Sequence, residues 1–382
     1  MLYKIKDLVI NKGLLRGPFG GALKKEIFVE KGADTYKVYE QGCVLNKDHT
    51  IGNYYITKEY FNSKMKNFEA LPGDILVSCS GVNYGAIYKL PEEIEKGIIN
   101  QALLRIRVNK NIINDDYFCY IFQFLISNII TASSGDSTIP NFPPLNTIKE
   151  IEVDIPPLSE QEKIVTFLNS IRNKIECNNN IIKSLTNKIK EAYSFYVKSC
   201  DDTGQKYVIN ELLSFKKGIE PIKTETGNLI KYYRVRDIDS DTFSLIKDNQ
   251  NLLIAKYGDV IYSLDGTIGK ISYSIEGAIS SGLYIVSSSY TKYPILYYCI
   301  MDDEEIKLKL QYGSRSNTII KHASSLLKNI EYKINLEIAE KFAIEYTPLF
   351  DKCIMLSKEN LVLKNIKEHM AKLLLSKNAI IN

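Results

Sequence analysis

The side chains that most often carry catalysis or bind metals are few and scattered along this chain of 382 residues. It has only three histidines, and its seven cysteines form no Cys-x-x-Cys pair. Metal sites need clustered ligands, and a nucleophilic triad needs a histidine beside the nucleophile. The spacing therefore predicts neither a metal centre nor a catalytic triad. Scattered thiols favour a reduced, cytoplasmic protein.

One short motif is superficially similar to a catalytic one. Asn141-Phe-Pro-Pro-Leu145 resembles the Asn-Pro-Pro-Tyr motif of adenine methyltransferases, in which the asparagine binds the target amino group and the aromatic ring stacks on the flipped base. Here a phenylalanine interrupts the motif and the final aromatic residue is missing, so a turn leading into a strand is the favoured interpretation. Gly266-Thr-Ile-Gly-Lys270 lacks the length and the Ser or Thr of a phosphate-binding loop. We expect no catalytic group here.

Charged pairs have a simpler interpretation as surface features. The acids of Asp115-Asp116 and of Asp302–Glu305 are predicted to be solvated helix ends. Arg105 and Arg107 alternate on a predicted strand, so one face carries both, as edge-strand charge or as phosphate contacts.

What remains are cationic, amide and hydroxyl side chains on predicted loops, the types that contact DNA phosphates and base edges. Lys24 and Lys25 are equally well explained as a solvated pair, and the 314–318 segment as a plain surface turn. A net charge of +4 is low for an autonomous DNA binder, so we expect partners to supply part of the affinity. The candidates in the first half are Arg16, Lys24, Lys25, Asn83, Tyr84, Ser134 and Ser137. Those in the second half are Arg234, Arg236, Lys270, Arg315, Asn317 and Lys321.

The sequence segments that must form the elements positioning these residues occur twice along the chain. Gly73-Asp-Ile-Leu-Val-Ser78 returns as Gly258-Asp-Val-Ile-Tyr-Ser263, and Ile99-Asn-Gln-Ala-Leu103 lines up with Ile279-Ser-Ser-Gly-Leu283. Several such matches in one order predict a tandem repeat. Each half begins with short strands and turns, includes a helix (near 115–127 and, less regularly, near 293–310), and ends in a glycine-free helical stretch.

The first helical stretch has the clearest pattern. Pro156-Pro157 and the predicted capping box Ser159–Glu162 mark its start. Apolar residues then recur in steps of four and three, which is the heptad pattern of a coiled coil, with Asn178 at one seam position. The predicted seam residues are Ile164, Leu168, Ile171, Ile175, Asn178, Ile182, Leu185 and Ile189.

A second helix, at about 336–377, is the expected partner of the first. Pro348 should kink or restart it, and Lys367 interrupts its stripe. The alternative is that each helix only covers its own domain, but a polar seam residue on both helices is typical of a coiled coil with a fixed register. Its predicted seam residues are Leu349, Leu356, Asn360, Leu363 and Met370.

Several of these segments together resemble the specificity subunits of type I restriction–modification enzymes. The run Ile155-Pro-Pro-Leu-Ser-Glu-Gln-Glu-Lys-Ile164 is similar to the entry of their central conserved helix. The segments Leu14–Gly21 and Tyr232–Ile238, the repeated Gly-Asp strand and the half-repeat layout also match, across essentially the whole chain. Asn335–Lys341 departs from the pattern, because it lacks the Pro-Pro-Leu and the Glu-Gln pair.

The resemblance implies a non-catalytic subunit with an α+β fold. Two target recognition domains, at 1–157 and 201–334, would each bind one half of a split double-stranded DNA site. Two antiparallel coiled-coil helices, at 158–200 and 335–382, would set the half-site spacing, near one helical turn of DNA, and dock two methyltransferase subunits. Those partners would bring S-adenosylmethionine, and ATP-driven restriction subunits would join some complexes. No apolar run is long enough to span a membrane. The alternatives are an enzyme with an unrecognised motif and an orphan or scaffold paralogue without such partners.

Overall fold

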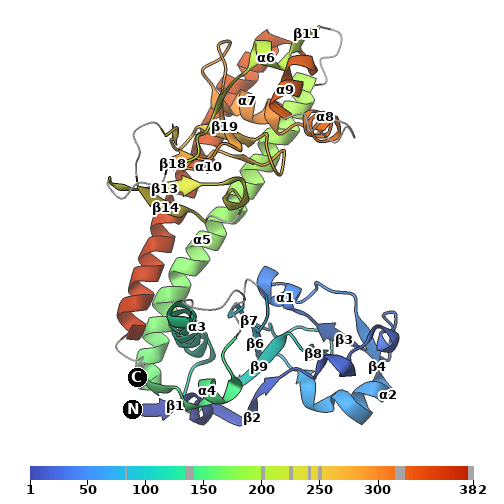
Figure 1. Cartoon of the computed structure of the whole chain (residues 1–382), viewed down its shortest axis with the longest axis vertical. Coiled ribbons are helices and arrows are strands. Elements are labelled where there is room, and N and C mark those ends of the chain that lie inside the picture. Colours follow the sequence, from blue (N-terminus) through green and yellow to red (C-terminus); the bar gives the residue numbers. More distant parts are fainter. Residues whose placement is uncertain are drawn as a thin grey trace. The chain divides into compact units, whose positions relative to one another are not determined.

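A computed structural model of the chain describes residues 1–81, 84–133, 142–198, 203–222, 227–239, 242–247, 252–314 and 323–376. The chain divides into two compact units (Figure 1). Unit 1 comprises Met1–Arg172 and the C-terminal segment from Asn365, and unit 2 comprises Asn173–Lys364. No helix of the described residues is long and apolar enough to cross a membrane.

Unit 1 contains two four-stranded sheets and one two-stranded sheet. The first has the order β2-β9-β6-β7 and is antiparallel throughout. The second has the order β4-β3-β8-β5, with β3 and β8 parallel, and β1 pairs with β10. The strands are β1 (Leu2–Lys4), β2 (Val9–Arg16), β3 (Thr35–Tyr39), β4 (Tyr55–Thr57), β5 (Glu69–Ala70), β6 (Ile75–Ser78), β7 (Ile87–Lys89), β8 (Gly97–Ile99), β9 (Leu103–Val108) and β10 (Glu152–Asp154).

The helix expected near 115–127 is α3, which spans Asp115–Ser133. The Asn114 side chain caps it by accepting hydrogen bonds from the Asp116 and Tyr117 amides. Its apolar residues at helical spacing pack with the first sheet in one buried core. The other helices of unit 1 are α1 (Gln41–Asn46), α2 (Lys58–Tyr60) and α4 (Leu145–Glu150), with single turns at Ile5–Leu8, Gly20–Ala22, Lys25–Ile27, Phe61–Met65 and Lys66–Phe68.

Unit 2 repeats this topology strand for strand, which confirms the predicted tandem repeat. Its sheets have the orders β12-β19-β16-β17 and β14-β13-β18-β15, with β13 and β18 parallel, and β11 pairs with β20. Each strand of unit 2 thus corresponds to the strand ten places earlier. The strands are β11 (Gln205–Val208), β12 (Ser214–Lys217), β13 (Leu229–Tyr233), β14 (Ser244–Lys247), β15 (Ile254–Ala255), β16 (Val260–Ser263), β17 (Ile271–Ser272), β18 (Gly277–Ile279), β19 (Leu283–Ser287) and β20 (Glu331–Ile334).

The helix expected near 293–310 is instead two helices, α7 (Pro294–Met301) and α8 (Glu304–Ser314). The chain breaks between them at Asp302-Asp303, and the prediction that these acids are solvated is wrong. Their side chains are only 6% and 2% exposed, and Asp302 pairs with Lys190 and Lys307 while Asp303 pairs with Lys198. Buried carboxylates need such partners. The other helical segments of unit 2 are α6 (Ile209–Leu212), α9 (Ala323–Leu326), Val235–Asp237 and Leu327–Asn329.

The acids at the start of α3 are also engaged rather than solvated. Asp116 forms an ion pair with Lys89 at 2.5 Å and accepts a hydrogen bond from Asn169. Asp115 pairs with Lys110 at 3.3 Å. Burial alone would raise the pKa of Asp116, but the hydrogen bond and charge of Lys89 and the hydrogen bond from Asn169 hold it below the usual value.

The two long helices are α5 (Leu158–Tyr193), followed by a wider turn at Ser194–Lys198, and α10 (Leu336–Ser376). The capping-box prediction is wrong, because α5 begins one residue earlier and Ser159 lies inside its first turn. Pro348 does not restart the second helix, since α10 continues through this residue.

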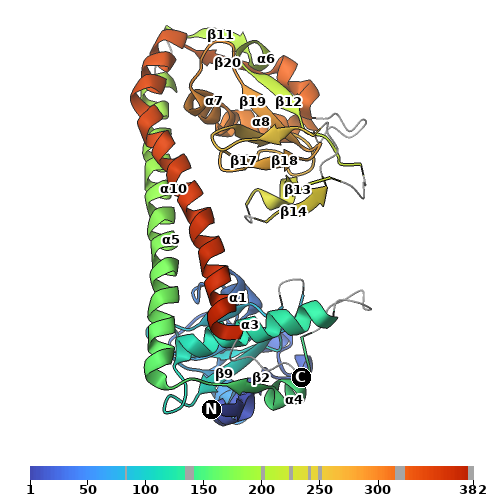
Figure 2. The ribbon, with the colours of Figure 1, turned by 90° about the vertical axis from the view of Figure 1, so that its left-hand side faces the viewer.

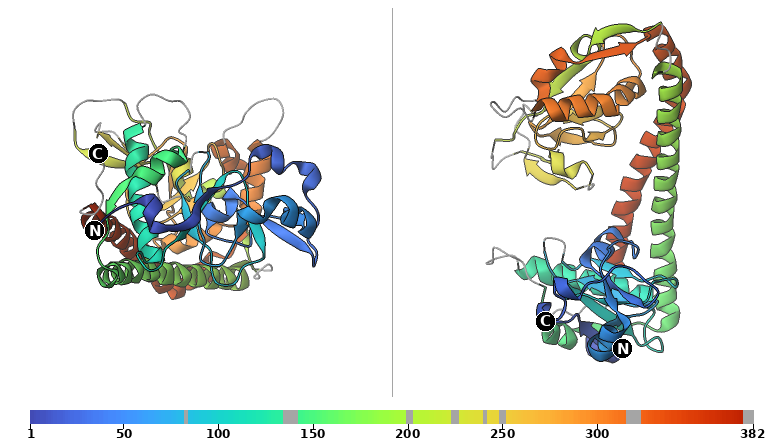
Figure 3. Two further views of the ribbon diagram at one scale, coloured as in Figure 1. Left: turned by 90° about the horizontal axis from the view of Figure 1, so that it is seen from below. Right: turned by 90° about the vertical axis from the view of Figure 1, so that its right-hand side faces the viewer.

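The helices pair with each other inside each unit, so neither only covers its own domain. In unit 2, Asn178 Nδ2 donates to Asn360 Oδ1 at 2.9 Å, and the Tyr193 and Phe342 rings are 5.4 Å apart. The residue numbers rise on one helix as they fall on the other, which makes the pair antiparallel (Figures 2 and 3). In unit 1, Leu168 and Leu375 belong to one buried core.

The seam positions differ in burial along the helices. Buried ones are Ile164, Leu168, Ile171, Asn178, Ile189, Leu356 and Asn360. Partly buried ones are Ile175, Ile182, Leu185, Leu349, Leu363 and Met370.

Candidate nucleic-acid interface

The turns that carry several predicted contact residues of unit 2 meet at one edge of its sheets. Strands β12 and β16 both run antiparallel to β19 and end opposite its first residues, where Lys217 pairs with Tyr284 and Ser263 pairs with Leu283. The parallel pair β13–β18 ends at the same place, because the Ser280 amide donates to the Tyr233 carbonyl. The segments that follow β12, β13, β16 and β18 therefore lie together; we call them the unit 2 edge.

Unit 1 has the same edge, formed by the segments that follow β2, β3, β6 and β8. Arg16 pairs with Leu104 and Ser78 with Leu103, while the Asn100 amide donates to the Tyr39 carbonyl. We call these segments the unit 1 edge.

A glycine ends the first strand of each edge because no side chain fits there. A Cβ atom on Gly17 would lie 1.8 Å from the Asn100 carbonyl oxygen, and one on Gly218 would lie 2.2 Å from that of Ser280. The Gly17 and Gly218 amides donate to the Leu103 and Leu283 carbonyls. The chain is thereby held close to the neighbouring turn, and the cation before each glycine, Arg16 or Lys217, stays at the edge.

The unit 2 edge carries a polar network around Arg234. Its guanidinium carbon lies 5.4 Å from the centre of the Tyr232 ring. The Tyr232 hydroxyl donates to Glu220 at 2.7 Å, and Glu220 also accepts from the amide and hydroxyl of Ser281. Burial alone would raise the pKa of Glu220, but these hydrogen bonds and the Arg234 charge hold it below the usual value. A carboxylate that stays ionised here attracts the Arg234 guanidinium.

Two further predicted residues of unit 2 lie at the same edge. Lys270 forms an ion pair with Asp239 at 2.6 Å, and Arg236 lies 3.8 Å from the carboxylate of Asp237. Asp237 is itself buried and accepts a hydrogen bond from the Arg234 amide. The structure thus brings Arg234, Arg236 and Lys270 to one place.

In unit 1 the predicted residues are more dispersed. Arg16 lies exposed at the edge, and Tyr84 is half-buried in the turn after β6. Lys24 and Lys25 are exposed around the short turn Lys25–Ile27, beyond the edge. Asn83, Ser134, Ser137, Arg315, Asn317 and Lys321 lie outside the described residues.

Arg105 and Arg107 hold the fold of unit 1 together and are not edge-strand charges. Their strand, β9, is central in its sheet. Arg105 is 3% exposed and donates to the carbonyls of Asn67 and Glu69, while Arg107 forms an ion pair with Asp74 at 2.6 Å. The alternating pattern correctly predicted a strand, but it could not predict that this strand is central in its sheet.

Sequence reasoning missed Gln41 and Lys217, and it noticed Gln161 only as part of a family motif. Gln161 is fully buried. Gln41 donates to Ser78 Oγ and the Ser80 carbonyl at the unit 1 edge. Lys217 pairs with Asp265 at 3.1 Å and lies over the Tyr284 ring at the unit 2 edge. For Lys217 the signal was its place before a glycine, as for Arg16.

The buried and half-buried thiols among the described residues are poor nucleophiles. Burial raises the pKa of Cys79 to about 12, and burial together with the Asp116 charge raises that of Cys119 to about 12. Burial also raises the pKa of Cys299 and Cys353. Such thiols stay protonated at neutral pH. Within the described ranges, no three His, Cys, Asp or Glu side chains are grouped to hold a metal ion.

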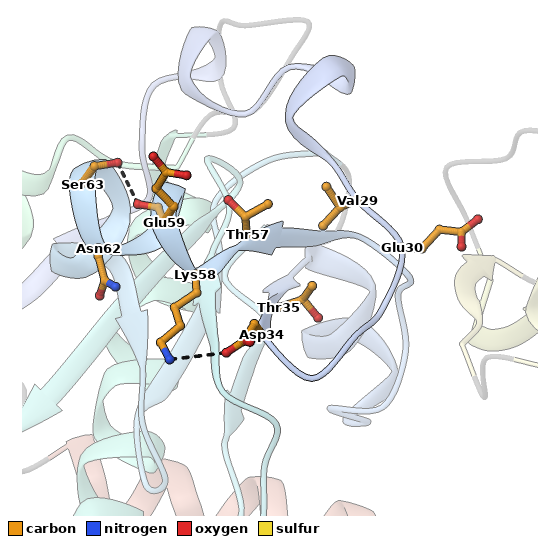
Figure 4. A pocket seen from close by; sticks show the side chains of 9 residues that line it. All are labelled: Val29, Glu30, Asp34, Thr35, Thr57, Lys58, Glu59, Asn62 and Ser63. Atoms are coloured by element: carbon orange, nitrogen blue, oxygen red, sulfur yellow. Dashed lines mark hydrogen bonds and ion pairs between the residues drawn. The ribbon is translucent and has the colours of Figure 1, made fainter.

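An open hollow beside β4 carries the wrong charge for phosphate. Glu30, Asp34 and Glu59 contribute carboxylates to its lining, and Lys58 is engaged with Asp34 at 3.3 Å (Figure 4). Glu30 and Glu59 form no ion pair with any described residue, and their carboxylates would repel a nucleic-acid backbone. The two edges, not this hollow, are the candidate interface.

Comparison with known proteins agrees with this arrangement. The family model "Type I restriction modification DNA specificity domain" matches residues 16–187. The chain contains a type I restriction–modification specificity domain. The match spans nearly all of the first recognition unit and most of α5, and the second unit repeats its topology.

A solved structure of this kind shares the fold. The chain is similar to the type I restriction–modification S subunit from M. genitalium, with 17% identity, a TM-score of 0.55, and coverage of 100% of this chain and 96% of that one. Similarity to the HsdS subunit from Thermoanaerobacter tengcongensis has a TM-score of 0.37, with 14% identity over 98% of this chain and 96% of that one. No curated protein gives a match.

Proposed function

We propose that the chain is the DNA specificity subunit of a type I restriction–modification complex. Each unit would bind one part of a bipartite site in double-stranded DNA. The observation that carries the proposal is the repeated edge: two units of one topology present cations, amides and hydroxyls at equivalent turns. Such side chains bind phosphates and base edges. The family match to the first unit gives the same function class.

The chemistry of modification would come from partners. We propose that α5 and α10 set the spacing of the two half-sites and dock two methyltransferase subunits, with restriction subunits joining some complexes. S-adenosylmethionine and ATP would bind to those partners. One of the solved structures similar to this chain, with a TM-score of 0.44, 14% identity and coverage of 99% of this chain and 96% of the other, is described as showing complex assembly of the type I system.

The decisive experiment is co-expression with the methyltransferase encoded beside it, followed by mapping of modified adenines. We expect a bipartite motif. Exchange of residues 201–334 for the corresponding domain of another such subunit should change only one half of that motif. A change in both halves would contradict separate recognition by the two units.

A second candidate is an orphan or scaffold paralogue with the same fold. The departure of Asn335–Lys341 from the family pattern favours it, since this is where the second helix begins. Absence of a neighbouring methyltransferase gene, and no co-purifying methyltransferase, would support this candidate over the first.

A further inference from the structure

Unit 1 contains a group of cations that the recognition edges do not use. The Lys367 ammonium, on α10, lies 5.6 Å from the centre of the Tyr120 ring on α3. Burial and then the charges of Lys47 and Arg172 lower the pKa of Lys367, and the Arg172 charge also acts on Tyr120. We call Lys47, Arg172 and Lys367 around Tyr120 the basic cluster. Helix α3 lies against the α5 segment of this unit (Figures 1 and 2).

The charge of the basic cluster is only partly compensated by nearby carboxylates. In the part of the chain that the structure describes, none of its three cations forms an ion pair. The Arg172 charge acts on Asp116, but that carboxylate already forms an ion pair with Lys89 and accepts a hydrogen bond from Asn169. The one anion that acts on the pKa of Lys367 is its neighbour Glu368. Lys47 also has a left-handed backbone, with φ of 51°, at a helix end where glycine or asparagine is usual.

The second repeat shows that the fold does not need cations here. When α5 and α10 are aligned from their first residues, Leu158 and Leu336, Phe350 is the repeat equivalent of Arg172. Ile189 is the equivalent of Lys367. Phe350 and Ile189 are 2% and 1% exposed. The Phe350 ring lies 4.8 Å from that of Tyr273 and 5.3 Å from that of Tyr298. Unit 2 thus fills these two positions with apolar contacts. Unit 1 instead places like charges together, which lowers its stability.

We propose that the basic cluster of unit 1 is a binding site for phosphates of the DNA backbone. This rests on the proposed function, since it assumes that DNA is the ligand of the subunit. Arginine and lysine are the side chains that neutralise phosphates, and the phosphodiester would supply the ion-pair partner that these three cations do not have among the described residues. Contacts of this kind position the protein on the duplex and carry no base information.

The test exchanges the basic cluster for the residues of the second repeat. The full-length Arg172→Phe/Lys367→Ile variant keeps side chains that the same fold already accommodates. Arg172→Gln/Lys367→Gln serves as a second variant in case the first fails to fold. The control is Lys64→Gln/Lys66→Gln, which removes two charges from exposed residues of unit 1 that lie outside its edge and outside both long helices. Binding to a fluorescent duplex of mixed sequence is measured over a salt series, with the chain alone and with its methyltransferase.

We expect both cluster variants to lose affinity by about eightfold for each phosphate contact at 0.1 M salt, because each contact contributes about 0.9 to the slope of log K against log salt. The slope should fall by about two for the double variants. The control should stay close to the wild type, and the methylated sequence should not change.

The outcomes separate the two proposals. If the wild type binds DNA and both cluster variants match the control in affinity and slope, the basic cluster is not a phosphate site and the proposed function stands. If the wild type binds no DNA in either form, the proposed function fails and this site fails with it. A change in the methylated motif would overturn the site as a backbone contact.

Discussion

The same joint, where a long helix meets the helix that covers the first sheet, is built differently in the two units. In unit 1, Gln161 of α5 is fully buried, accepts the Asn114 amide at 2.8 Å, and donates to the carbonyls of Ile112 and Pro156. The equivalent position of α10 is Ala339, which is also fully buried. A fold can therefore keep a joint while its polar contacts are replaced.

Unit 2 does not require the glutamine, because fewer of its backbone amides at this joint need a hydrogen-bond acceptor. The Tyr293 amide, which corresponds to that of Asn114, donates to Thr291 Oγ1 at 3.2 Å. Pro294 follows as the first residue of α7 and has no amide hydrogen to satisfy. The start of α7 thus explains structurally why Asn335–Lys341 can lack the Glu-Gln pair. A motif that is missing from one repeat is therefore compensated elsewhere in that repeat.

The largest effect should come from charge placed in the seam of unit 1. Leu168 is fully buried, whereas its equivalent in unit 2, Tyr346, is partly exposed. We expect Leu168→Asp to destabilise unit 1 by about 4 kcal/mol or more, because an unpaired carboxylate would be buried. Tyr346→Asp should cost about 1–2 kcal/mol, mainly the lost stacking on Phe342 at 4.9 Å.

Amide hydrogen exchange on the full chain compares both variants, because each unit serves as the internal reference for the other. In Leu168→Asp the β6 and β9 amides should exchange faster while those of β16 and β19 keep their protection. Equal losses from the two substitutions would show that the seam has the same importance in both units.

Much of this comparison was available from the sequence, because it depends on periodicity and repetition. The heptad steps identified both helices, and the Gly-Asp strands at 73 and 258 identified the repeat. What failed depended on neighbours from distant parts of the chain. The sequence pattern predicted Asp303 to be a surface acid, but in the structure it is buried and pairs with Lys198 at 2.6 Å. Arg105 was predicted as a possible edge-strand charge, but its strand, β9, is central in its sheet.

The candidate contact residues were only partly predictable. Arg234, Arg236 and Lys270 are brought together by strand register, which no single segment encodes. Gln161 was noticed as part of a family motif, but its hydrogen bonds reach a turn about fifty residues earlier. Local patterns therefore predict elements, and the pairing of those elements decides which side chains form a site.

A middle-sized effect is expected at the polar joint. Gln161→Ala should cost unit 1 about 2–3 kcal/mol, because the buried Asn114 amide would lose its acceptor. Urea unfolding and exchange of the first α3 amides would measure this loss. The reciprocal Ala339→Gln should not stabilise unit 2, since the Tyr293 amide already has an acceptor in Thr291 and the added side chain overfills a buried position. A gain in unit 2 would disprove the compensation.

The smallest effect concerns the one polar pair of the seam in unit 2. Asn178 donates to Asn360 and Glu359, Asn360 donates to Asn179, and the buried Asn178 Oδ1 atom has no donor in the described part of the chain. By the alignment of the two helices, the repeat-equivalent positions are Leu356 and Ile182. We expect Asn178→Leu/Asn360→Ile to raise the stability of unit 2 by about 1 kcal/mol, since apolar packing replaces an incompletely satisfied pair.

The single substitution Asn178→Leu should lower stability instead, because Asn360 would keep a buried amide without its partner. A polar pair that is costly to stability is typical of a coiled coil with a specified register. We therefore expect the double variant to lose uniqueness, seen as a second set of methyl NMR signals for Ile182 and Leu356. A more stable protein with one set of signals would show that apolar packing alone fixes the register in this unit.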